Sequence, residues 1–393
     1  MSSATLISPE RLGVLNRMRV LTALHAAGPQ SRAELARTFG VSRATVGTIL
    51  QPLLDNGILI ETEPAAASSG GPRSGGKPPR PVWFSASAPS IGAVEILPGR
   101  VRAATVSLTG EIRGRATAPF ATRTADPAGF AAALRSCCAE AFAGTTVVGI
   151  GVASAGLVDP GQGRLVELNA APALTGHPIG DTLAEQLAAP VYLEHHARVQ
   201  ALGDRWFGAG RGLDTFASVS TGDSVGVGVV QQGAVLSAPG AGSGAHLTVA
   251  AGGDRCDCGR RGCWKTVATI GWLRRRAAAL GVPGARGTTL ARLTARAGRG
   301  DRSAVRLIDE YAANLALGLG NVQQLLAPGT FVLHGDAATG GVRFAELVAG
   351  HLTAHSPHHP DAVPTVTLAA AGPDTVLLGC AGLVLSQGMQ LVR

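Results

Sequence analysis

Three cysteines and one histidine in the second half of the chain have the residue types and the spacing of a metal site. They are His246, Cys256, Cys258 and Cys263. Zinc prefers four nitrogen or sulfur ligands in a tetrahedron, and one imidazole with three thiolates satisfies that preference. Gly259 and Gly262 permit the tight turn that such a loop needs. Because protein groups fill all four positions, we expect a structural zinc ion; the alternative is three unrelated cysteines in a glycine-rich loop.

A second group of residues, near the N-terminus, has side chains that contact DNA in other proteins. It consists of Ser42, Arg43, Thr45 and Thr48, followed by the more distant Arg73, Lys77 and Arg80. Arginine can form two hydrogen bonds with a guanine edge, and the start of a helix presents backbone N–H groups to a phosphate. We therefore predict that Arg43 contacts a base and that the three later cations lie over phosphates or in a minor groove.

Three helices and two strands are predicted to position these DNA-contacting residues. Ser31 with Glu34 forms a capping box at the start of the second helix, and Ser42 caps the third. The expected ranges are 10–27 for the first helix, 43–55 for the third, and 57–61 and 81–84 for the strands. Capped helices joined through a glycine-containing turn, followed by two strands around a basic loop, predict a winged helix-turn-helix. The alternative is a small helical bundle that contacts proteins.

The composition is typical of a folded protein with more than one domain. The chain has 393 residues, 46% of them hydrophobic, and a formal net charge of +8, which favours a polyanionic partner such as DNA. We find no signal peptide and no run of about twenty apolar residues, so we expect no membrane contact. Cys256, Cys258 and Cys263 are assigned to the predicted zinc site within residues 246–263, which we call the metal loop. Two more cysteines, Cys137 and Cys138, are neighbours. A reducing cytoplasm is therefore expected.

The metal loop resembles the signature of the ROK family of repressors and sugar kinases. Family members carry a Gly-His motif followed by Cys-x-Cys-Gly-x-x-Gly-Cys. In this chain residues 256–263 match the cysteine motif and His246 matches the histidine. Segments 31–36, 41–46 and 76–81 resemble the DNA-binding half of ROK repressors, which the kinases of the family lack. The resemblance implies an α/β architecture, with a winged helix joined to a two-lobed actin-like body, and a zinc ion held by the four residues named above.

Two departures from the family pattern fall where the kinases perform their chemistry. The kinases carry Glu-Asn-Asp-Ala, with Asp as the general base, at the stretch that reads Glu-His-His-Ala over 194–197. His196 takes the Asp position and His195 the Asn position. The first phosphate hairpin, Asp-x-Gly-Gly-Thr in the kinases, holds Glu, Leu, Pro and Arg within 95–100. Proline lacks a donor and bulky residues crowd a phosphate, so we expect no catalytic residue and no kinase activity.

Other departures fall in the pocket that holds the sugar in active members. Two family glutamates are replaced by Ser243 and Lys265, while Asn169 matches a sugar-binding asparagine. With His196 in place of Asp, the pocket loses three negative charges and gains one positive charge. We predict an effector pocket, suited to an anionic or phosphorylated sugar, formed by Asn169, His196, Ser243, His246 and Lys265. Two alternatives remain open: the cleft binds nothing, and the two histidines are only polar residues at a strand end.

These observations predict a cytoplasmic DNA-binding regulator, expected to repress carbohydrate-related genes as a homodimer or higher homo-oligomer on a double-stranded operator. The expected domains are a winged helix over 1–84, a first actin-like lobe over 85–193 with 372–393, and a second lobe over 194–371 that carries the zinc loop. Arg274, Arg275 and Arg276 are interpreted as a solvated helix face, with a second DNA contact as the alternative. The rival functions are a regulator controlled by a protein partner, with an inert cleft, and a sugar kinase with a DNA-binding head.

Overall fold

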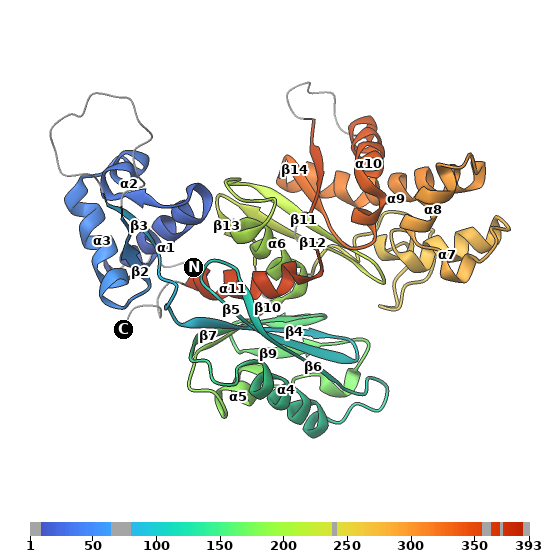
Figure 1. Ribbon diagram of the computed structural model, residues 1–393. Coiled ribbons are helices and arrows are strands. Elements are labelled where there is room, and N and C mark those ends of the chain that lie inside the picture. Colours follow the sequence, from blue (N-terminus) through green and yellow to red (C-terminus); the bar gives the residue numbers. More distant parts are fainter. Residues whose placement is uncertain (1–8, 64–79, 238–241, 356–362, 370–371, 388–393) are drawn as a thin grey trace, which may run out of the picture.

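The computed structural model describes residues 9–63, 80–237, 242–355, 363–369 and 372–387, which form a head and two lobes (Figure 1). The head lies at one end of the molecule, and helices α6 (His196–Phe207) and α11 (Thr375–Gln387) lie between the sheets of the two lobes. None of the helices in these ranges combines the length and the apolar character that crossing a bilayer would require.

The head is a three-helix unit with a small antiparallel sheet. Its elements are α1 (Pro9–Ala27), β1 (Gln30–Ser31), α2 (Arg32–Phe39), α3 (Arg43–Asp55), β2 (Leu59–Glu61) and β3 (Pro81–Phe84), with sheet order β1-β3-β2. The predicted capping box is confirmed: the Ser31 N–H donates to Glu34 Oε2 at 2.7 Å and the Glu34 N–H to Ser31 Oγ at 3.3 Å. Ser42 likewise accepts from the Thr45 N–H. The additional strand β1 forms because the cap residue Ser31 has an extended backbone and pairs with Pro81.

The first lobe is built on a five-stranded sheet of order β10-β7-β4-β5-β6. Its strands are β4 (Ser90–Leu97), β5 (Arg100–Val106), β6 (Ile112–Pro119), β7 (Val147–Ser154) and β10 (Val191–His195). Strands β4, β5 and β6 are antiparallel, whereas β7 and β10 continue the sheet in parallel. Helices α4 (Pro127–Ala141) and α5 (Ile179–Ala184) pack on this sheet, and the short hairpin β8 (Leu157–Asp159) with β9 (Arg164–Glu167) lies beside it.

The second lobe repeats this arrangement. Its sheet has the order β13-β12-β11-β14-β15, with strands β11 (Phe216–Thr221), β12 (Val225–Gln231), β13 (Ala234–Val235), β14 (Thr330–Leu333) and β15 (Thr365–Leu368). Three antiparallel strands are again followed by two parallel ones. The remaining helices are α7 (Ile270–Ala279), α8 (Leu290–Ala297), α9 (Arg302–Leu326) and α10 (Gly341–His355). Two lobes of one topology agree with the predicted actin-like fold.

Two helices cross where the lobes meet. α6 (His196–Phe207) packs on β11 and β12 of the second lobe, and α11 (Thr375–Gln387) packs on β4 and β7 of the first. At Gly379 of α11, a Cβ atom would lie 1.9 Å from the Val199 carbonyl oxygen of α6. No residue with a side chain fits there without separating the helices, so this glycine sets the distance between the two lobes.

The head shares its hydrophobic core with the body. Leu24 of α1 and Phe84 of β3 belong to one buried cluster with Trp206 of α6 and several residues of α11. The His25 ring lies 4.4 Å from the Phe84 ring and 5.2 Å from Trp206, and Arg211 donates to the His25 carbonyl oxygen. Burial and the charge of Arg211 lower the pKa of His25 from 6.5 to about 4. The head is therefore packed onto the body.

Candidate functional site

The four predicted metal ligands come together in the second lobe. Their nitrogen and sulfur atoms all lie within 4.8 Å of one another, with Cys256 Sγ 3.5 Å from His246 Nδ1 and Cys258 Sγ 3.7 Å from Cys263 Sγ. Tetrahedral zinc, with bonds of about 2.0–2.3 Å, separates its ligands by about 3.3–3.8 Å. The donor set and its spacing therefore fit zinc.

Backbone geometry explains how the loop brings these ligands together. Gly259 and Gly262 have φ values of +85° and +67°, as expected for tight turns. A Cβ atom on Gly262 would lie 1.6 Å from the Ala250 carbonyl oxygen. The adjoining Trp264 is fully buried, and its indole N–H donates to the Asn314 carbonyl oxygen of α9 at 2.9 Å. The metal loop is thereby fixed to the longest helix among the described residues.

A partly buried network of polar contacts around the buried Glu95 occupies the other predicted position, where the first hairpin meets α6. His196 Nε2 lies 2.9 Å from Glu95 Oε1, and Arg102 donates to Glu95 Oε2 at 2.7 Å. Arg102 also bonds Asp374 Oδ1 at 2.8 Å, which joins the hairpin to the segment before α11. Burial opposes ionisation of Glu95, but the hydrogen bonds and charges of His196 and Arg102 outweigh it and lower the pKa of Glu95.

His195, the neighbour of His196, has a different role. Its Nδ1 accepts the Ala197 N–H at 3.2 Å, so this side chain is the N-cap of α6. Burial, assisted by the charges of Arg198 and His196, lowers the pKa of His195 to about 3. The ring is therefore neutral at physiological pH, in agreement with Nδ1 acting as an acceptor.

The remaining predicted effector residues come from different parts of the body. Lys265 Nζ bonds Asp257 Oδ2 at 2.7 Å, across the metal loop that also contains His246. Ser243 is half-buried, and its carbonyl oxygen accepts the Val227 N–H. Asn169 is exposed in the turn after β9. Within the described part of the chain, no hydrogen bond joins Asn169 to the other four predicted residues.

The predicted DNA-contacting residues of α3 are exposed together at its N-terminal turns. Ser42, Arg43, Thr45 and Thr48 all face solvent, and Ser42 Oγ lies 2.9 Å from Thr45 Oγ1. Arg80, just before β3, is also exposed. Arg73 and Lys77 lie outside the described residues. The start of α3 is therefore free to enter a major groove.

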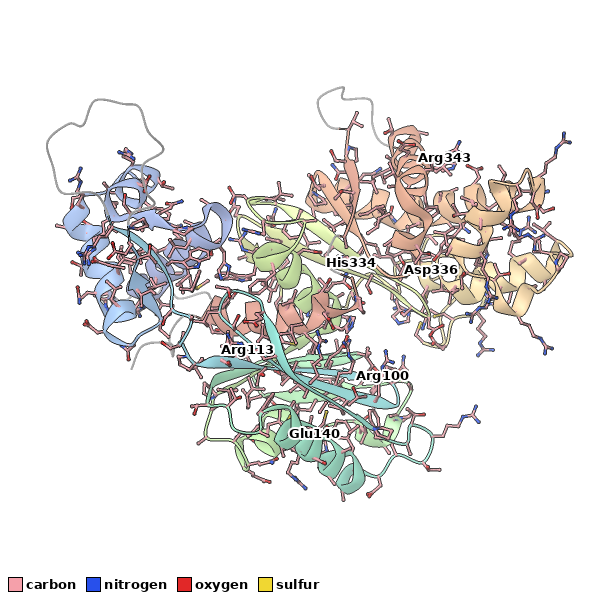
Figure 2. The ribbon with its side chains drawn as sticks, viewed as in Figure 1. Arg100, Arg113, Glu140, His334, Asp336 and Arg343 are labelled. Carbon is pink, nitrogen blue, oxygen red and sulfur yellow. The ribbon has the colours of Figure 1, made fainter. Side chains whose placement is uncertain are left out.

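One buried polar cluster was not predicted from the sequence. Asp204 Oδ2 accepts Ser218 Oγ at 2.6 Å and lies 2.7 Å from His334 Nε2, which links α6 to β11 and to the residue after β14. Nearby, Asp336 Oδ1 accepts the Leu290 N–H at the start of α8, and burial raises the pKa of Asp336. Figure 2 labels His334 and Asp336 in the second lobe. The partners in this cluster are up to 130 residues apart, so no local pattern reveals it.

Comparison with known proteins gives matches for the body and for the head. A family model described as "ROK family" matches residues 92–387, and a model described as a helix-turn-helix domain matches residues 16–62. A glucokinase of Halalkalibacterium halodurans is 29% identical over 258 residues, which are 61% of this chain and 77% of that protein. A putative xylose repressor of Caldicellulosiruptor is 23% identical over 395 residues, 95% of this chain and 96% of the relative.

A solved structure supports the same fold. It is described as a ROK family transcriptional regulator, a homolog of the E. coli MLC protein, and it covers 97% of this chain and 98% of its own with a TM-score of 0.79. Its sequence identity is 20%, so the likeness shows the fold alone. This fold includes the N-terminal head as well as both lobes.

Proposed function

The chain belongs to the ROK family, and from this premise we propose that it is a DNA-binding transcriptional regulator that represses carbohydrate-related genes. The observation that carries this proposal is the exposed start of α3, in a head whose core is continuous with the ROK body. The repressor relative matches 95% of the chain, whereas the glucokinase relative matches 61%. The proposed function therefore uses the head as well as the body.

In this proposal the head reads a double-stranded operator. Arg43, Thr45 and Thr48 contact base edges in the major groove, while the cap at Ser42 presents backbone N–H groups to a phosphate. The basic residues of the wing, Arg73, Lys77 and Arg80, contact phosphates or a minor groove. A homodimer or higher homo-oligomer places two heads on a palindromic site. We place the protein in the cytoplasm, where the operator is.

The body acts as a sensor without kinase activity. Phosphoryl transfer needs a general base, a phosphate cradle and a metal-bound nucleotide. His196 Nε2 is bonded to Glu95, and the hairpin that would hold phosphates carries Pro98 and the salt bridge of Glu95 with Arg102. A coupled assay for ADP formation across common hexoses tests this, and saturable turnover would contradict it.

We assign a structural zinc ion to His246, Cys256, Cys258 and Cys263. Bound zinc would satisfy the three thiolates and stiffen the loop that Trp264 fixes to α9. We propose three domains with the bounds expected from the sequence: the head over 1–84, the first lobe over 85–193 with 372–393, and the second lobe over 194–371.

The proposed effector is an anionic or phosphorylated sugar bound by Asn169, His196, Ser243, His246 and Lys265. An effector that prefers one arrangement of the two lobes shifts the separation of the DNA heads, because it changes the population of that arrangement. Thermal unfolding in the presence of sugars, sugar phosphates and nucleotides tests this proposal. A ligand that binds only the folded protein raises the midpoint, because it adds RT ln(1 + [L]/Kd) to the free energy of unfolding.

One observation favours a second candidate, a regulator controlled by a protein partner with an inert cleft. His196 and Lys265, two residues of the predicted effector pocket, already bond Glu95 and Asp257. A ligand would have to displace these carboxylates. Under this alternative no sugar, sugar phosphate or nucleotide stabilises the protein, while a protein partner recovered from the native host changes operator occupancy.

The experiment that tests DNA reading begins with genome-wide mapping of bound sites in the native host, which supplies the operator. Arg43→Ala should weaken operator binding by about 1 to 3 kcal/mol and relax base preference at one position. Arg37→Ala, an exposed arginine on α2, is the matched control. Equal operator affinity of Arg43→Ala and the wild type would contradict the placement of α3 in the groove.

A further inference from the structure

The positive charge of the chain is concentrated in one part of the second lobe. Residues 255–306 contain thirteen Arg and Lys residues against two acidic residues, a net charge of +11, whereas the whole chain has +8. Residues 1–84, which include the head, carry nine basic and five acidic residues, a net charge of +4. The most basic part of the protein is therefore not its DNA-reading head.

Five of the exposed arginines of this segment lie between α7 and the start of α9. They are Arg275, Arg286, Arg292, Arg299 and Arg302, which we call the basic surface. They come from α7, η3 (Ala285–Gly287), α8, the turn after α8 and the start of α9, and these elements pack together in pairs. In Figure 2, blue nitrogen tips project outward around α7 and α8.

Nearby acidic groups are already paired with other arginines. Glu310 bonds Arg276 at 2.6 Å and Arg306 at 2.8 Å, and Asp301 bonds Arg296 at 2.6 Å. These acids therefore do not neutralise the basic surface. The guanidinium groups of Arg286, Arg299 and Arg302 form no ion pair among the described residues.

The surroundings of these arginines fit a nucleic acid better than a protein. Val305 is the only exposed large hydrophobic residue within 255–306 among the described residues. Stable protein interfaces have a core of aromatic and aliphatic side chains, and charged residues are depleted from it. Duplex DNA, by contrast, offers a dense row of phosphates and gains affinity from every cation that displaces a counterion.

We propose that the basic surface is a second DNA-binding surface, which contacts the phosphate backbone of duplex outside the operator. The inference rests on the proposed DNA-binding function, since the operator-bound head brings flanking duplex into reach. Figure 1 shows α3 and the helices α7 and α8 at opposite ends of the molecule. The two surfaces therefore contact separate stretches of DNA, and only a duplex longer than the operator can occupy both.

Two matched variants test this inference in the full-length protein. Arg286→Gln/Arg299→Gln/Arg302→Gln removes three charges from the basic surface, and Arg100→Gln/Arg123→Gln/Arg164→Gln removes three from exposed positions of the first lobe. Both variants have the same net charge, so a difference in their DNA affinity reflects where the removed charges lie on the protein. Binding is measured against salt concentration on an operator duplex of about 20 base pairs, which spans two half-sites, and on the same operator within a duplex many times longer.

On the long duplex, the basic-surface variant should bind roughly tenfold or more weakly than the control variant and reduce the salt slope by about 2 to 3. On the short duplex, the two variants should bind alike. Replacing the same three arginines by lysine should restore most of the affinity, which separates charge from a folding defect. The midpoint of thermal unfolding provides a further check on folding.

Equal binding of the two glutamine variants on the long duplex overturns the inference, and so does an equal loss on short and long duplexes. A basic-surface variant that binds DNA normally but loses an acidic protein partner assigns the surface to protein recognition instead. Failure of the proposed function looks different, because then the wild-type protein binds neither duplex at physiological salt.

Discussion

The metal loop and the first hairpin of the body differ in how far apart in the sequence their interacting residues lie. The four metal ligands fall within 246–263, and two glycines with positive φ are enough to bring three of them together. At the hairpin, Glu95 bonds His196 and Arg102, and Arg102 bonds Asp374, residues 101 and 272 positions apart. The difference indicates that the metal loop and the first hairpin can change independently: all four metal ligands are present, while the hairpin holds the salt bridge of Glu95 with Arg102.

The largest effect should come from breaking the metal loop. Cys258→Ser removes one of four ligands, and we expect the bound zinc to fall from about one ion per chain to nearly none. Because metal binding contributes folding free energy, the unfolding midpoint should fall by at least about 10 °C. Elemental mass spectrometry and thermal unfolding measure both quantities. Cys137→Ala, in a buried helix of the first lobe, should keep the zinc; equal zinc content in wild type and Cys258→Ser would contradict the site.

Breaking the contacts of Glu95 with His196 and Arg102 should have a smaller effect on stability. Glu95→Ala leaves Arg102 and His196 without their shared carboxylate, and we expect a loss of about 2 to 3 kcal/mol in the free energy of unfolding. Glu111→Ala, which removes an exposed pair with Arg113, should cost less than about 1 kcal/mol. Chemical denaturation at neutral pH compares the two variants, and similar losses would mean that the network is unimportant.

The carboxylate of Glu95 also predicts that the stability of the protein depends on pH in the acid range. The pKa of Glu95 is lowered in the folded state, so its contribution to stability is complete above the unfolded value near 4.5 and is lost as the pH falls through the folded value. Wild-type protein should therefore lose stability relative to Glu95→Ala below about pH 4.5. A constant difference between the two proteins from pH 7 to pH 3 would contradict this prediction.

A more modest effect is expected at the cap of α6. The pKa of His195 is lowered from 6.5 to about 3, so the unfolded chain binds a proton that the folded chain excludes. Stability is complete above pH 6.5 and is lower by about 1.4 kcal/mol one pH unit below that value. His195→Asn keeps a side chain that can cap a helix and should flatten this part of the profile. An unchanged profile in His195→Asn would contradict this prediction.

The smallest effect should be on catalysis. His196→Asp restores the residue type found at this position in the family kinases, yet we expect ADP formation to stay at background. The reason is that Pro98 and the Glu95–Arg102 salt bridge remain where a phosphate cradle is needed. The coupled assay includes an active ROK glucokinase as positive control. Sugar-dependent turnover by His196→Asp would show that the hairpin still accepts a nucleotide.

The head and the metal loop could be predicted from the sequence because their determinants are local. Ser31 with Glu34, and Ser42 with Thr45, are three residues apart, and α3 spans the predicted range. The ion pairs of His196 and Lys265 could not be predicted, since their partners are chosen by the packing of strands and loops. The sequence places His195 at the Asn position of the kinases, and its residue type does not reveal the cap of α6, because the preferred N-cap residues are Ser, Thr, Asp and Asn.

The shared core of head and body also sets an order of events during synthesis. Leu377 and Leu385 of α11 lie in the same buried cluster as Leu24 of α1. A ribosome adding about 5 to 20 residues per second needs roughly 20 to 80 s for a chain of this length. The head is synthesised first, but it cannot complete its packing against the body until α11 has been synthesised. A truncated messenger RNA that ends before α11 would therefore produce a head that is not packed against the body.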